Sequence, residues 1–456
     1  MKKFLEPESV AVFGVSRRTG EGAFNILENL LSYGYRGRVY PVNPNASEIL
    51  GIKVYHSLGE VPEKCELAVV SLPRGIVPQV VGECASSGIE SVVIVTQGFA
   101  DADDEEGKRL QRELDGLIRK NNVRILGPNT FGTGNAFTNF SSAFVRMDMK
   151  RIPVGVICQT GVFMVGFPFL KLIGKGIDLG NGCDLDFADG LEYFEQDSDT
   201  KVVALHIEGT RDGARFLKAA KRITRKKPVV ALKTGKSEQA ALAAQSHTGS
   251  LVGKDEVWDA ALKQSGIIRV SSVEELADVV KAFYTLPPMK GRRLGVSTYT
   301  GGLGIMCIDA CNKSGLEIAG LSLTTTEQLS MLFPSWQNVN NPADIWPAIM
   351  VAKKASLSEV QETAVETLLN DPEIDAVLCI LGAFFPDSGT SLNRMIKRAT
   401  ESHPDKPLVF HIYGAFADEI KTELEETGKT LVFPSLDRAT ATLGQLVRYQ
   451  EFRSML

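Results

Sequence analysis

Short apolar runs alternate with amphipathic segments along the first third of the chain. Residues 9–15 and 67–72 are almost wholly apolar and lie beside a glycine or proline turn, whereas residues 22–34 and 105–121 carry apolar residues at the spacing of a helix. Apolar strands between such helices are typical of a parallel sheet that is covered on both faces. The pattern therefore predicts an α/β, Rossmann-like domain over residues 1–150.

The same alternation returns twice further along the chain. Apolar runs that end in glycine occupy residues 153–161, 202–209 and 228–235. Pro287 and Pro288 then indicate a linker, and a similar run follows at residues 293–302. The runs PVGVICQTG and RLGVSTYTGG are loosely alike, which indicates a repeated unit. We therefore predict two doubly wound, flavodoxin-like domains, over residues 151–286 and 290–456.

The composition disfavours several classes of function. The 456 residues are 44% hydrophobic and 23% charged, with a formal net charge of −5, which does not favour a nucleic-acid or membrane-surface partner. No apolar run approaches the ~18–20 residues of a membrane span, and the N-terminal residues lack a signal-peptide pattern. The seven cysteines are scattered without a C-x-x-C pair, so we expect free thiols, a cytoplasmic location and no metal site.

The first glycine turn, at residues 14–20, resembles a dinucleotide-binding fingerprint but departs from it. Ser16 stands where a second glycine would let a pyrophosphate approach, and Asn43 stands where an acidic residue would bind the ribose of NAD. NAD is therefore disfavoured. A phosphate-bearing ligand remains open, because the helix start after Gly14 would offer unpaired N–H groups and Arg17 adds positive charge. The alternative is a solvated turn without a ligand.

Three further turns end strands of the same predicted sheet. They contain Pro73, Gln97 and Asn129, each at or just after the end of an apolar run. The carboxyl ends of parallel strands meet at one edge of a sheet, where such sheets usually bind their ligands. We therefore expect the three turns to form one polar rim.

The five histidines differ in their surroundings along the sequence. His56 and His403 lie in loop segments and are expected at the surface, whereas His206 and His411 lie within apolar strands and are expected in the core. His247 lies in the run AAQSHTGSLVG, whose small residues would let another molecule approach and would let a loop move. The composition alone leaves two interpretations, a functional histidine and a histidine in a flexible loop.

Two other segments favour a functional His247. Glu208 follows an apolar strand, so its carboxylate is expected at the strand's carboxyl end, where it could hold the Nδ1–H of an imidazole and leave Nε2 as the nucleophile. Gln159, Thr160 and Gly161 begin a predicted helix whose free N–H groups could hold a phosphoryl group. Together these residues predict a phosphohistidine site.

Motifs that include these residues resemble the NDP-forming acyl-CoA synthetases, the superfamily of succinyl-CoA synthetase and ADP-forming acetyl-CoA synthetase. The chain looks most like the α-subunit type of the latter. The matching stretches lie in order within residues 8–285 and include SVAVFGVSR, GRVYPVNP, RILGPN, ICQTG, ALHIEGTRDG, KPVVALKTGKS and SHTGSLVG. The remainder is similar, more loosely, to the family's final flavodoxin-like domain.

The resemblance implies a ligase that interconverts acyl-CoA, phosphate and NDP with a carboxylic acid, CoA and NTP through an acyl phosphate. It implies that His247 carries the phosphoryl group and that Glu208 supports its imidazole. The phosphate-binding turn then corresponds to Gln159, Thr160 and Gly161. The resemblance also implies coenzyme A on the first domain, where we predict contacts from Gly14, Ser16, Arg17, Asn43, Pro73, Gln97 and Asn129.

Two departures from the family bear on partners and substrates. No segment resembles the ATP-grasp domain that binds ATP or ADP with Mg²⁺ in this family and adds ~200 residues or more in fused relatives. The resemblance therefore implies a separate ATP-grasp β-type partner, a hetero-oligomer, and a small carboxylic acid as substrate. Phe163 and Met164 are bulkier than the residues usual after the phosphate-binding turn, so they either reshape the acyl pocket or only pack a core.

Three alternatives belong to other classes of protein. The first is a non-catalytic CoA-binding protein of the same fold, which the intact His247 and Glu208 disfavour. The second is an NAD-dependent enzyme, which Ser16 and Asn43 disfavour. The third is an acyl-CoA hydrolase, which would cleave the thioester in the absence of phosphate and NDP.

Overall fold

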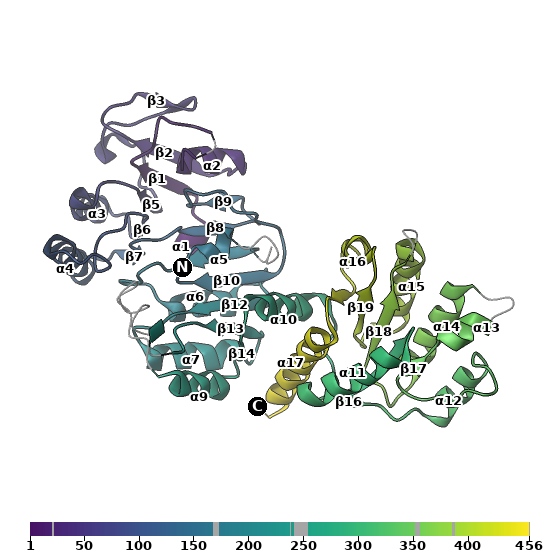
Figure 1. Ribbon diagram of the computed structural model, residues 1–456. Coiled ribbons are helices and arrows are strands. Elements are labelled where there is room, and N and C mark those ends of the chain that lie inside the picture. The colour runs from purple at the N-terminus through teal and green to yellow at the C-terminus, as the bar shows by residue number, and fades with distance from the viewer. Residues whose placement is uncertain are drawn as a thin grey trace. The chain divides into compact units, whose positions relative to one another are not determined.

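The computed structural model describes residues 1–20, 22–166, 173–237, 239–240, 254–351, 356–384 and 388–455. The chain divides into two compact units, Met1–Val280 and Lys281–Leu456 (Figure 1). Each unit is built from mainly parallel sheets with helices on their faces, which confirms the predicted α/β fold class.

The first sheet of the first unit has the strand order β2-β1-β5-β6-β7, and all its neighbouring strands are parallel. Its strands are β1 (Ser9–Phe13), β2 (Arg38–Val42), β5 (Leu67–Val70), β6 (Ser91–Ile94) and β7 (Arg124–Leu126). The helices α2 (Ile26–Ser32), α3 (Val77–Ser86) and α4 (Glu105–Lys120) connect them, and β3 (Glu48–Ile49) pairs with β4 (Ile52–Lys53) in a small hairpin. Alternate residues of β1 enter two different hydrophobic clusters, so both faces of this sheet are buried.

The second sheet has the order β14-β13-β12-β10-β11-β8-β9. Its strands are β8 (Thr133–Asn135), β9 (Phe140–Ser141), β10 (Val154–Cys158), β11 (Lys175–Asp178), β12 (Val202–Ile207), β13 (Val229–Lys233) and β14 (Ile268–Val270). Its helices are α5 (Val162–Val165), α6 (Phe187–Gln196), α7 (Gly213–Ile223), α9 (Asp255–Ser265) and α10 (Val273–Thr285). The antiparallel strands β8 and β9 come from the predicted 1–150 domain but pair with this sheet, so the three domain ranges stay a prediction.

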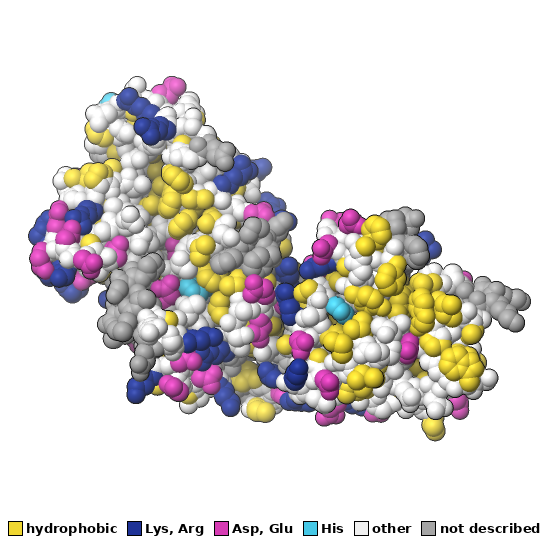
Figure 2. Space-filling model, in the orientation of Figure 1, with side chains coloured by type: hydrophobic (Ala, Val, Ile, Leu, Met, Phe, Trp, Pro, Cys, Tyr) yellow, Lys and Arg dark blue, Asp and Glu magenta, His cyan; other side chains and the backbone are white. Residues whose placement is uncertain are grey.

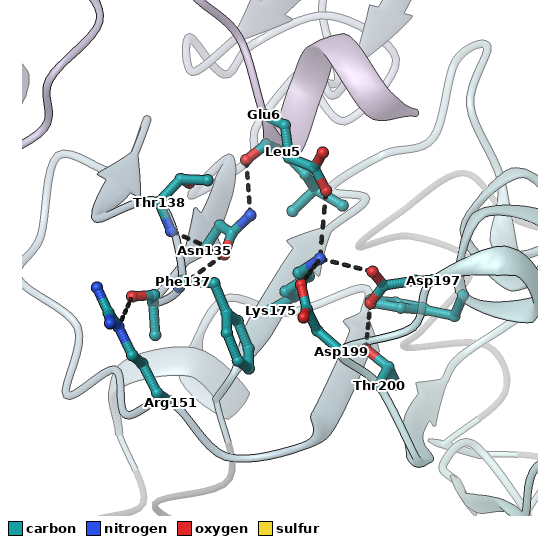
Figure 3. Close-up of polar contacts among 12 residues, drawn as sticks. Leu5, Glu6, Asn135, Phe137, Thr138, Arg151, Lys175, Asp197, Asp199 and Thr200 are labelled. Atoms are coloured by element: carbon teal, nitrogen blue, oxygen red, sulfur yellow. Dashed lines mark hydrogen bonds and ion pairs between the residues drawn. The ribbon is translucent and has the colours of Figure 1, made fainter.

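A buried lysine joins the N-terminal helix α1 (Lys2–Leu5) to the second sheet (Figure 3). The Nζ atom of Lys175 lies 2.7 Å from Asp197, 3.0 Å from Asp199 and 3.2 Å from Glu6, and the lysine side chain is only 2% exposed. Burial opposes the charge, yet the hydrogen bonds to Asp197 and Tyr193 hold the pKa of Lys175 above its ordinary value. The N-terminal segment is therefore fixed by charge as well as by apolar contact.

The second unit contains one sheet with the order β16-β15-β18-β19-β20, and a short strand β17 also pairs with β15. Its strands are β15 (Arg293–Thr298), β16 (Glu317–Ile318), β17 (Ala343–Asp344), β18 (Ala376–Gly382), β19 (Leu408–Tyr413) and β20 (Leu431–Phe433). On one face lie α11 (Gly301–Ser314) and α17 (Leu436–Ser454), which are side by side in Figure 1. The cluster on the other face includes α12 (Leu323–Ser330), α13 (Trp346–Val351), α14 (Leu357–Asn370), α15 (Ser388–Ser402) and α16 (Ala417–Glu425).

Each of the three sheets contains a point where the chain changes direction across the sheet. The reversals lie between β1 and β5, between β10 and β12, and between β15 and β18. The loops after the two strands run apart at such a point and leave a crevice at the carboxyl edge, where doubly wound proteins bind ligands. The fold thus offers three candidate crevices, and the side chains at their edges decide what each one can do.

Candidate functional site

The first crevice brings the turns after β1 and β5 close together. Gly14 has φ +79°, and an added Cβ would lie 1.9 Å from the carbonyl oxygen of Ser71, so no other residue fits there. The Asn43 side chain, at the end of β2, donates a hydrogen bond to the carbonyl of Val15 at 3.2 Å. Asn43 therefore holds the glycine turn in place, while Arg17 lies exposed beside it.

The helix after this turn differs from the prediction at its start. It begins at Ile26, and the Asn25 side chain accepts hydrogen bonds from the N–H groups of Leu27 and Glu28 at 3.0 and 3.2 Å. These first-turn N–H groups are therefore not available to a phosphate, contrary to our expectation. An anion at this turn would instead meet the loop around Ser16, whose hydroxyl accepts a hydrogen bond from the Arg18 N–H.

The three other turns of the first sheet lie together, as predicted. The Thr96 hydroxyl donates to the carbonyl of Leu72 at 2.7 Å, and the N–H of Asn129 donates to the carbonyl of Thr96 at 3.0 Å. Asn129 adopts a left-handed backbone conformation with φ +58°. The neighbouring Pro73 and Gln97 are exposed. The rim predicted from the sequence thus exists, and its contact with coenzyme A stays a prediction.

A segment that sequence analysis missed ties this rim to the second sheet. The Asp178 carboxylate accepts a hydrogen bond from the N–H of Phe131 at 2.7 Å, and the N–H of Asn181 donates to the carbonyl of Pro128 at 2.9 Å. At Gly180 (φ +56°), an added Cβ would lie 2.5 Å from the carbonyl oxygen of Asn129. Complete burial raises the pKa of Asp178 to about 6. The available signal was the Gly-Asn-Gly sequence at residues 180–182, one residue after the end of β11, which is typical of a tight turn.

The second crevice joins the two predicted site segments directly. In the parallel pairing of β10 and β12, Ile157 is the partner of Leu205, so the residues that follow the strands meet at one edge. The buried Gln159 side-chain oxygen accepts hydrogen bonds from the N–H groups of Glu208 and Gly209 at 2.7 and 2.9 Å. Glu208 is only 8% exposed. The structure therefore fixes the backbone of Glu208 through Gln159, which supports a positioned carboxylate.

The turn after Gln159 is closely packed. An added Cβ on Gly161 would lie 1.9 Å from the ring of Phe131, so glycine is required where the rim of the first sheet meets this turn. Thr160 is half-buried beside it. The Phe163 ring stacks on His206 with centroids 4.1 Å apart, and Met164 is also buried. These contacts favour the interpretation of both bulky residues as core packing.

Two buried basic side chains surround this edge. His206 lies in the core as predicted, with Nε2 3.1 Å from the Thr234 hydroxyl, and burial lowers its pKa to about 3. Lys233, at the end of β13, is 1% exposed and lies over the Trp258 ring at 5.5 Å. Burial lowers the pKa of Lys233 to about 8, and the nearby Glu208 carboxylate opposes that shift. Sequence analysis missed Lys233, although a lysine that ends a wholly apolar strand was a visible signal.

The remaining histidines give a mixed result. His56 is exposed as predicted, and His411 is half-buried with Nδ1 3.0 Å from the carbonyl of Phe433. His403 is half-buried beside Glu366, which differs from the predicted surface position because the end of α15 packs back on the unit. His247 lies outside the described residues, so its predicted contact with Glu208 stays a prediction.

Two further findings concern the cysteines and the helices. All seven cysteines are buried and unbonded, which confirms free thiols. Over the described ranges, no helix combines the length and the apolar character needed to cross a membrane.

Comparison with known families shows which proteins the chain is similar to. Residues 8–135 match the model of a CoA binding domain, and residues 153–283 match that of a succinyl-CoA ligase like flavodoxin domain. The chain is 37% identical to subunit alpha of acetate–CoA ligase (ADP-forming) II of Pyrococcus furiosus, with 93% of each chain covered. It is 34% identical to acetate–CoA ligase (ADP-forming) II of Archaeoglobus fulgidus, covering 99% of this chain and 67% of that protein.

The solved structures extend this similarity over both units. The dinucleotide-forming acetyl-coenzyme A synthetase 1 of Ca. Korarchaeum cryptofilum, solved with phosphate and ADP, matches with a TM-score of 0.89 and 29% identity, covering 99% of this chain and 97% of that chain. These findings favour an enzyme over a non-catalytic binding protein of the same fold.

Proposed function

Because the chain belongs to the family of ADP-forming acetate–CoA ligases, we propose that it is the α-type subunit of an acyl-CoA synthetase that works through a phosphorylated His247. The overall reaction interconverts acyl-CoA, phosphate and ADP with a carboxylic acid, CoA and ATP. The observation that carries the proposal is the junction of Gln159 and Glu208 at the crevice between β10 and β12. It fixes the backbone of Glu208 beside the turn proposed to hold phosphate, which supports a role for its carboxylate in the transfer.

Coenzyme A is proposed to bind along the rim of the first sheet. Exposed Arg17 would attract its phosphates, while the backbone around Ser16, Gln97 and Asn129 supplies polar groups in a fixed arrangement. The Asp178–Asn181 segment is hydrogen-bonded to this rim at Phe131 and Pro128. The N–H of Leu179 also donates to the carbonyl of Cys158, the residue before Gln159. A thioester held on the rim would therefore lie at a fixed position relative to Gln159 and Glu208.

The proposed chemistry consists of one acyl transfer followed by two phosphoryl transfers. A phosphate oxygen attacks the thioester carbonyl carbon, the C–S bond breaks, and the CoA thiolate departs. The product is an acyl phosphate. Nε2 of His247 attacks the phosphorus, the acyl P–O bond breaks, and the carboxylate leaves. An ADP oxygen then attacks the phosphohistidine, and the P–N bond breaks to give ATP. Glu208 is proposed to hold Nδ1–H of His247, which keeps Nε2 as the nucleophile and stabilises the charged ring.

The nucleotide is proposed to bind to a separate ATP-grasp β-type partner, together with Mg²⁺. The Pyrococcus furiosus relatives are named as alpha subunits, and the Archaeoglobus fulgidus relative is a longer single chain. Both facts support an enzyme that needs more than the domains found in this chain. We further propose a cytoplasmic hetero-oligomer, which is consistent with the seven unpaired thiols.

The test traps the phosphohistidine on the chain co-expressed with its ATP-grasp partner. Acetyl-CoA, Mg²⁺ and radiolabelled phosphate are supplied without ADP, and the protein is assayed for acid-labile, alkali-stable label. The wild-type chain and a His56→Ala control should be labelled, and His247→Ala should not. Equal labelling of His247→Ala would contradict the relay, and CoA release without phosphate would identify a hydrolase.

A further inference from the structure

A buried side chain in the turn after β11 connects the rim of the first sheet to the second sheet. Asn181 is 8% exposed. Its Nδ2 donates a hydrogen bond to Oδ1 of Asp101 at 2.9 Å, and its Oδ1 accepts one from Nδ2 of Asn129 at 3.4 Å. A buried amide that is bonded through both its oxygen and its nitrogen has one preferred orientation. Asn181 therefore specifies how the rim lies against the second sheet.

Asp101 continues this connection into the turn that contains Gln97. The Asp101 carboxylate accepts a hydrogen bond from the N–H of Gly98 at 3.1 Å and one from the N–H of Phe99 at 2.8 Å. Hydrogen bonds to a carboxylate are stronger than those between neutral groups, so the backbone directly after Gln97 is held firmly. The position of this turn thus depends on Asn181 through Asp101.

The outer side of the same turn is held by contacts of a different kind. Nη1 of Arg74 donates to the carbonyl of Gly98 at 3.1 Å, and Nη2 pairs with Asp104 and Glu106 at the start of α4. Figure 2 shows charged side chains of both signs gathered over α4. Exposed ion pairs of this kind contribute little, and these partners belong to the first sheet's own loops and helices. Asn181, in contrast, is buried and belongs to the second sheet.

The residue after Asn181 connects the same turn to the loop that follows Glu208. The carbonyl of Gly182 accepts a hydrogen bond from Nη1 of Arg211 at 3.0 Å. The Arg211 N–H and the Thr210 hydroxyl donate to the Asp186 carboxylate at 3.0 and 2.6 Å. The turn after β11 therefore contacts both the rim and the loop that begins at Glu208.

The proposed acyl transfer needs this alignment, whereas the phosphoryl transfer between His247 and the nucleotide does not use the rim. A phosphate oxygen must lie about 3–3.5 Å from the thioester carbonyl carbon before it can attack, and a displacement of about 1 Å can cost about a hundredfold in rate. We propose that Asn181 is a positioning residue for the acyl transfer, which acts through Asp101 to hold bound acyl-CoA in line with the phosphate turn. This inference rests on the proposed ligase function.

Two routes of labelling separate the steps in the chain co-expressed with its ATP-grasp partner. Saturating acetyl-CoA with radiolabelled phosphate and Mg²⁺ labels His247 only after acyl transfer, whereas γ-labelled ATP with Mg²⁺ labels it from the nucleotide side. Both rates are measured by rapid quench. Asn181→Leu keeps the branched shape of the side chain and removes both hydrogen bonds. We expect it to lower the rate from acetyl-CoA about fiftyfold and the rate from ATP less than about twofold.

A second variant keeps the test valid if Asn181→Leu does not fold. Asp101 is half-buried, and Asp101→Asn removes the charge that holds the turn while it keeps the shape of the side chain. It should lower the rate from acetyl-CoA about fivefold and leave the rate from ATP within about twofold. The matched control is Asn122→Leu, because Asn122 is an exposed amide that donates to Glu90 at 3.2 Å, and neither rate should change.

The outcomes distinguish this inference from the ligase proposal. An equal fall of both rates in Asn181→Leu would show a general structural role and overturn the inference. An unchanged rate from acetyl-CoA in either Asn181→Leu or Asp101→Asn would also overturn it, while wild-type labelling by both routes would leave the ligase proposal intact. A wild-type chain that acetyl-CoA and phosphate do not label would overturn the two together.

Discussion

The crevices at β10/β12 and β15/β18 have the same strand topology, but polar and charged side chains lie at the edge of the first and mostly apolar side chains at the edge of the second. The motifs that follow β10 and β15 place Gln159 and Tyr299 at equivalent positions. By strand register, Glu208 then corresponds to Gly382, and Lys233 corresponds to Ile412. The polar side chains of the β10/β12 crevice are thus replaced in the β15/β18 crevice by an aromatic side chain, a glycine and an aliphatic side chain.

This comparison extends to the buried charges of the two units. Among the described residues of the second unit, Asp371 is the only acidic or basic side chain that is buried. The first unit buries six, namely Lys175, Asp178, Asp186, Asp189, Glu208 and Lys233. Buried charges require partners that are placed accurately around them, while an apolar cavity requires only volume. The fold therefore supplies the position of a crevice, and a few side chains decide whether its edge is polar or apolar.

The largest expected effect separates the two crevices by activity. Glu208→Gln removes the charge proposed to support His247, and we expect the ligase rate of the reconstituted enzyme to fall about a thousandfold, or about 4 kcal/mol. The matched variant Tyr299→Phe, at the position equivalent to Gln159, should change the rate less than about threefold. Steady-state measurement of CoA release checks both, and a large effect of Tyr299→Phe would remove the distinction between the crevices.

The next effect concerns the buried charge cluster of the first unit. Lys175→Met leaves the buried Asp197 without its 2.7 Å ion pair, and we expect a loss of about 3 kcal/mol in the free energy of unfolding in urea. The control is Lys290→Met in the second unit, where the pair with Asp405 is 68% and 58% exposed. That variant should change stability by less than about 1 kcal/mol. Similar losses in both variants would contradict the comparison.

A smaller effect depends on pH. The pKa of His206 falls from 6.5 to about 3 on folding, so the unfolded chain binds one more proton between these values and stability falls as pH falls. Between pH 7 and pH 5 this contributes a loss of about 2 kcal/mol. Asp178, whose pKa is raised to about 6, acts in the opposite direction over part of the range.

The difference between the wild-type chain and His206→Gln isolates the histidine from this opposing carboxyl group. Urea unfolding at both pH values should show a loss in the wild-type chain that is about 2 kcal/mol greater than in the variant. Parallel pH dependences of the two proteins would show that His206 is charged in the folded state.

The smallest effect tests Lys233 as a positioning residue. Its charge lies near Glu208, and its pKa of about 8 means that the charge is lost as pH rises above that value. We expect Lys233→Met to lower the ligase rate about tenfold and to remove a decline in rate near pH 8, while Lys233→Arg restores activity and moves the decline to higher pH. A pH–rate profile that is unchanged in Lys233→Met would leave the lysine with a packing role only.

Sequence by itself determined the strands and helices wherever the hydrophobic pattern was local. The apolar runs that became β1, β5 and β10 needed no distant contacts to be identified, because a strand buried on both faces is mostly apolar along its whole length. It also located Glu208 and Gln159 at strand ends. The contact between these two residues depends on β10 and β12 being neighbours in the sheet. No single segment of the sequence shows the strand order.

Tertiary structure alone decided the features that depend on distant partners. Strand β11 escaped the pattern because it is short, begins with Lys175 and ends with Asp178. This lysine is buried only because Glu6 and Asp197 reach it from elsewhere in the chain. The capping of α2 by Asn25, the anchoring of the rim by Asn181 and the lowered pKa of Lys233 have the same origin. Hydrophobic periodicity is a local property of a chain, whereas burial of a charge is set by whatever folds around it.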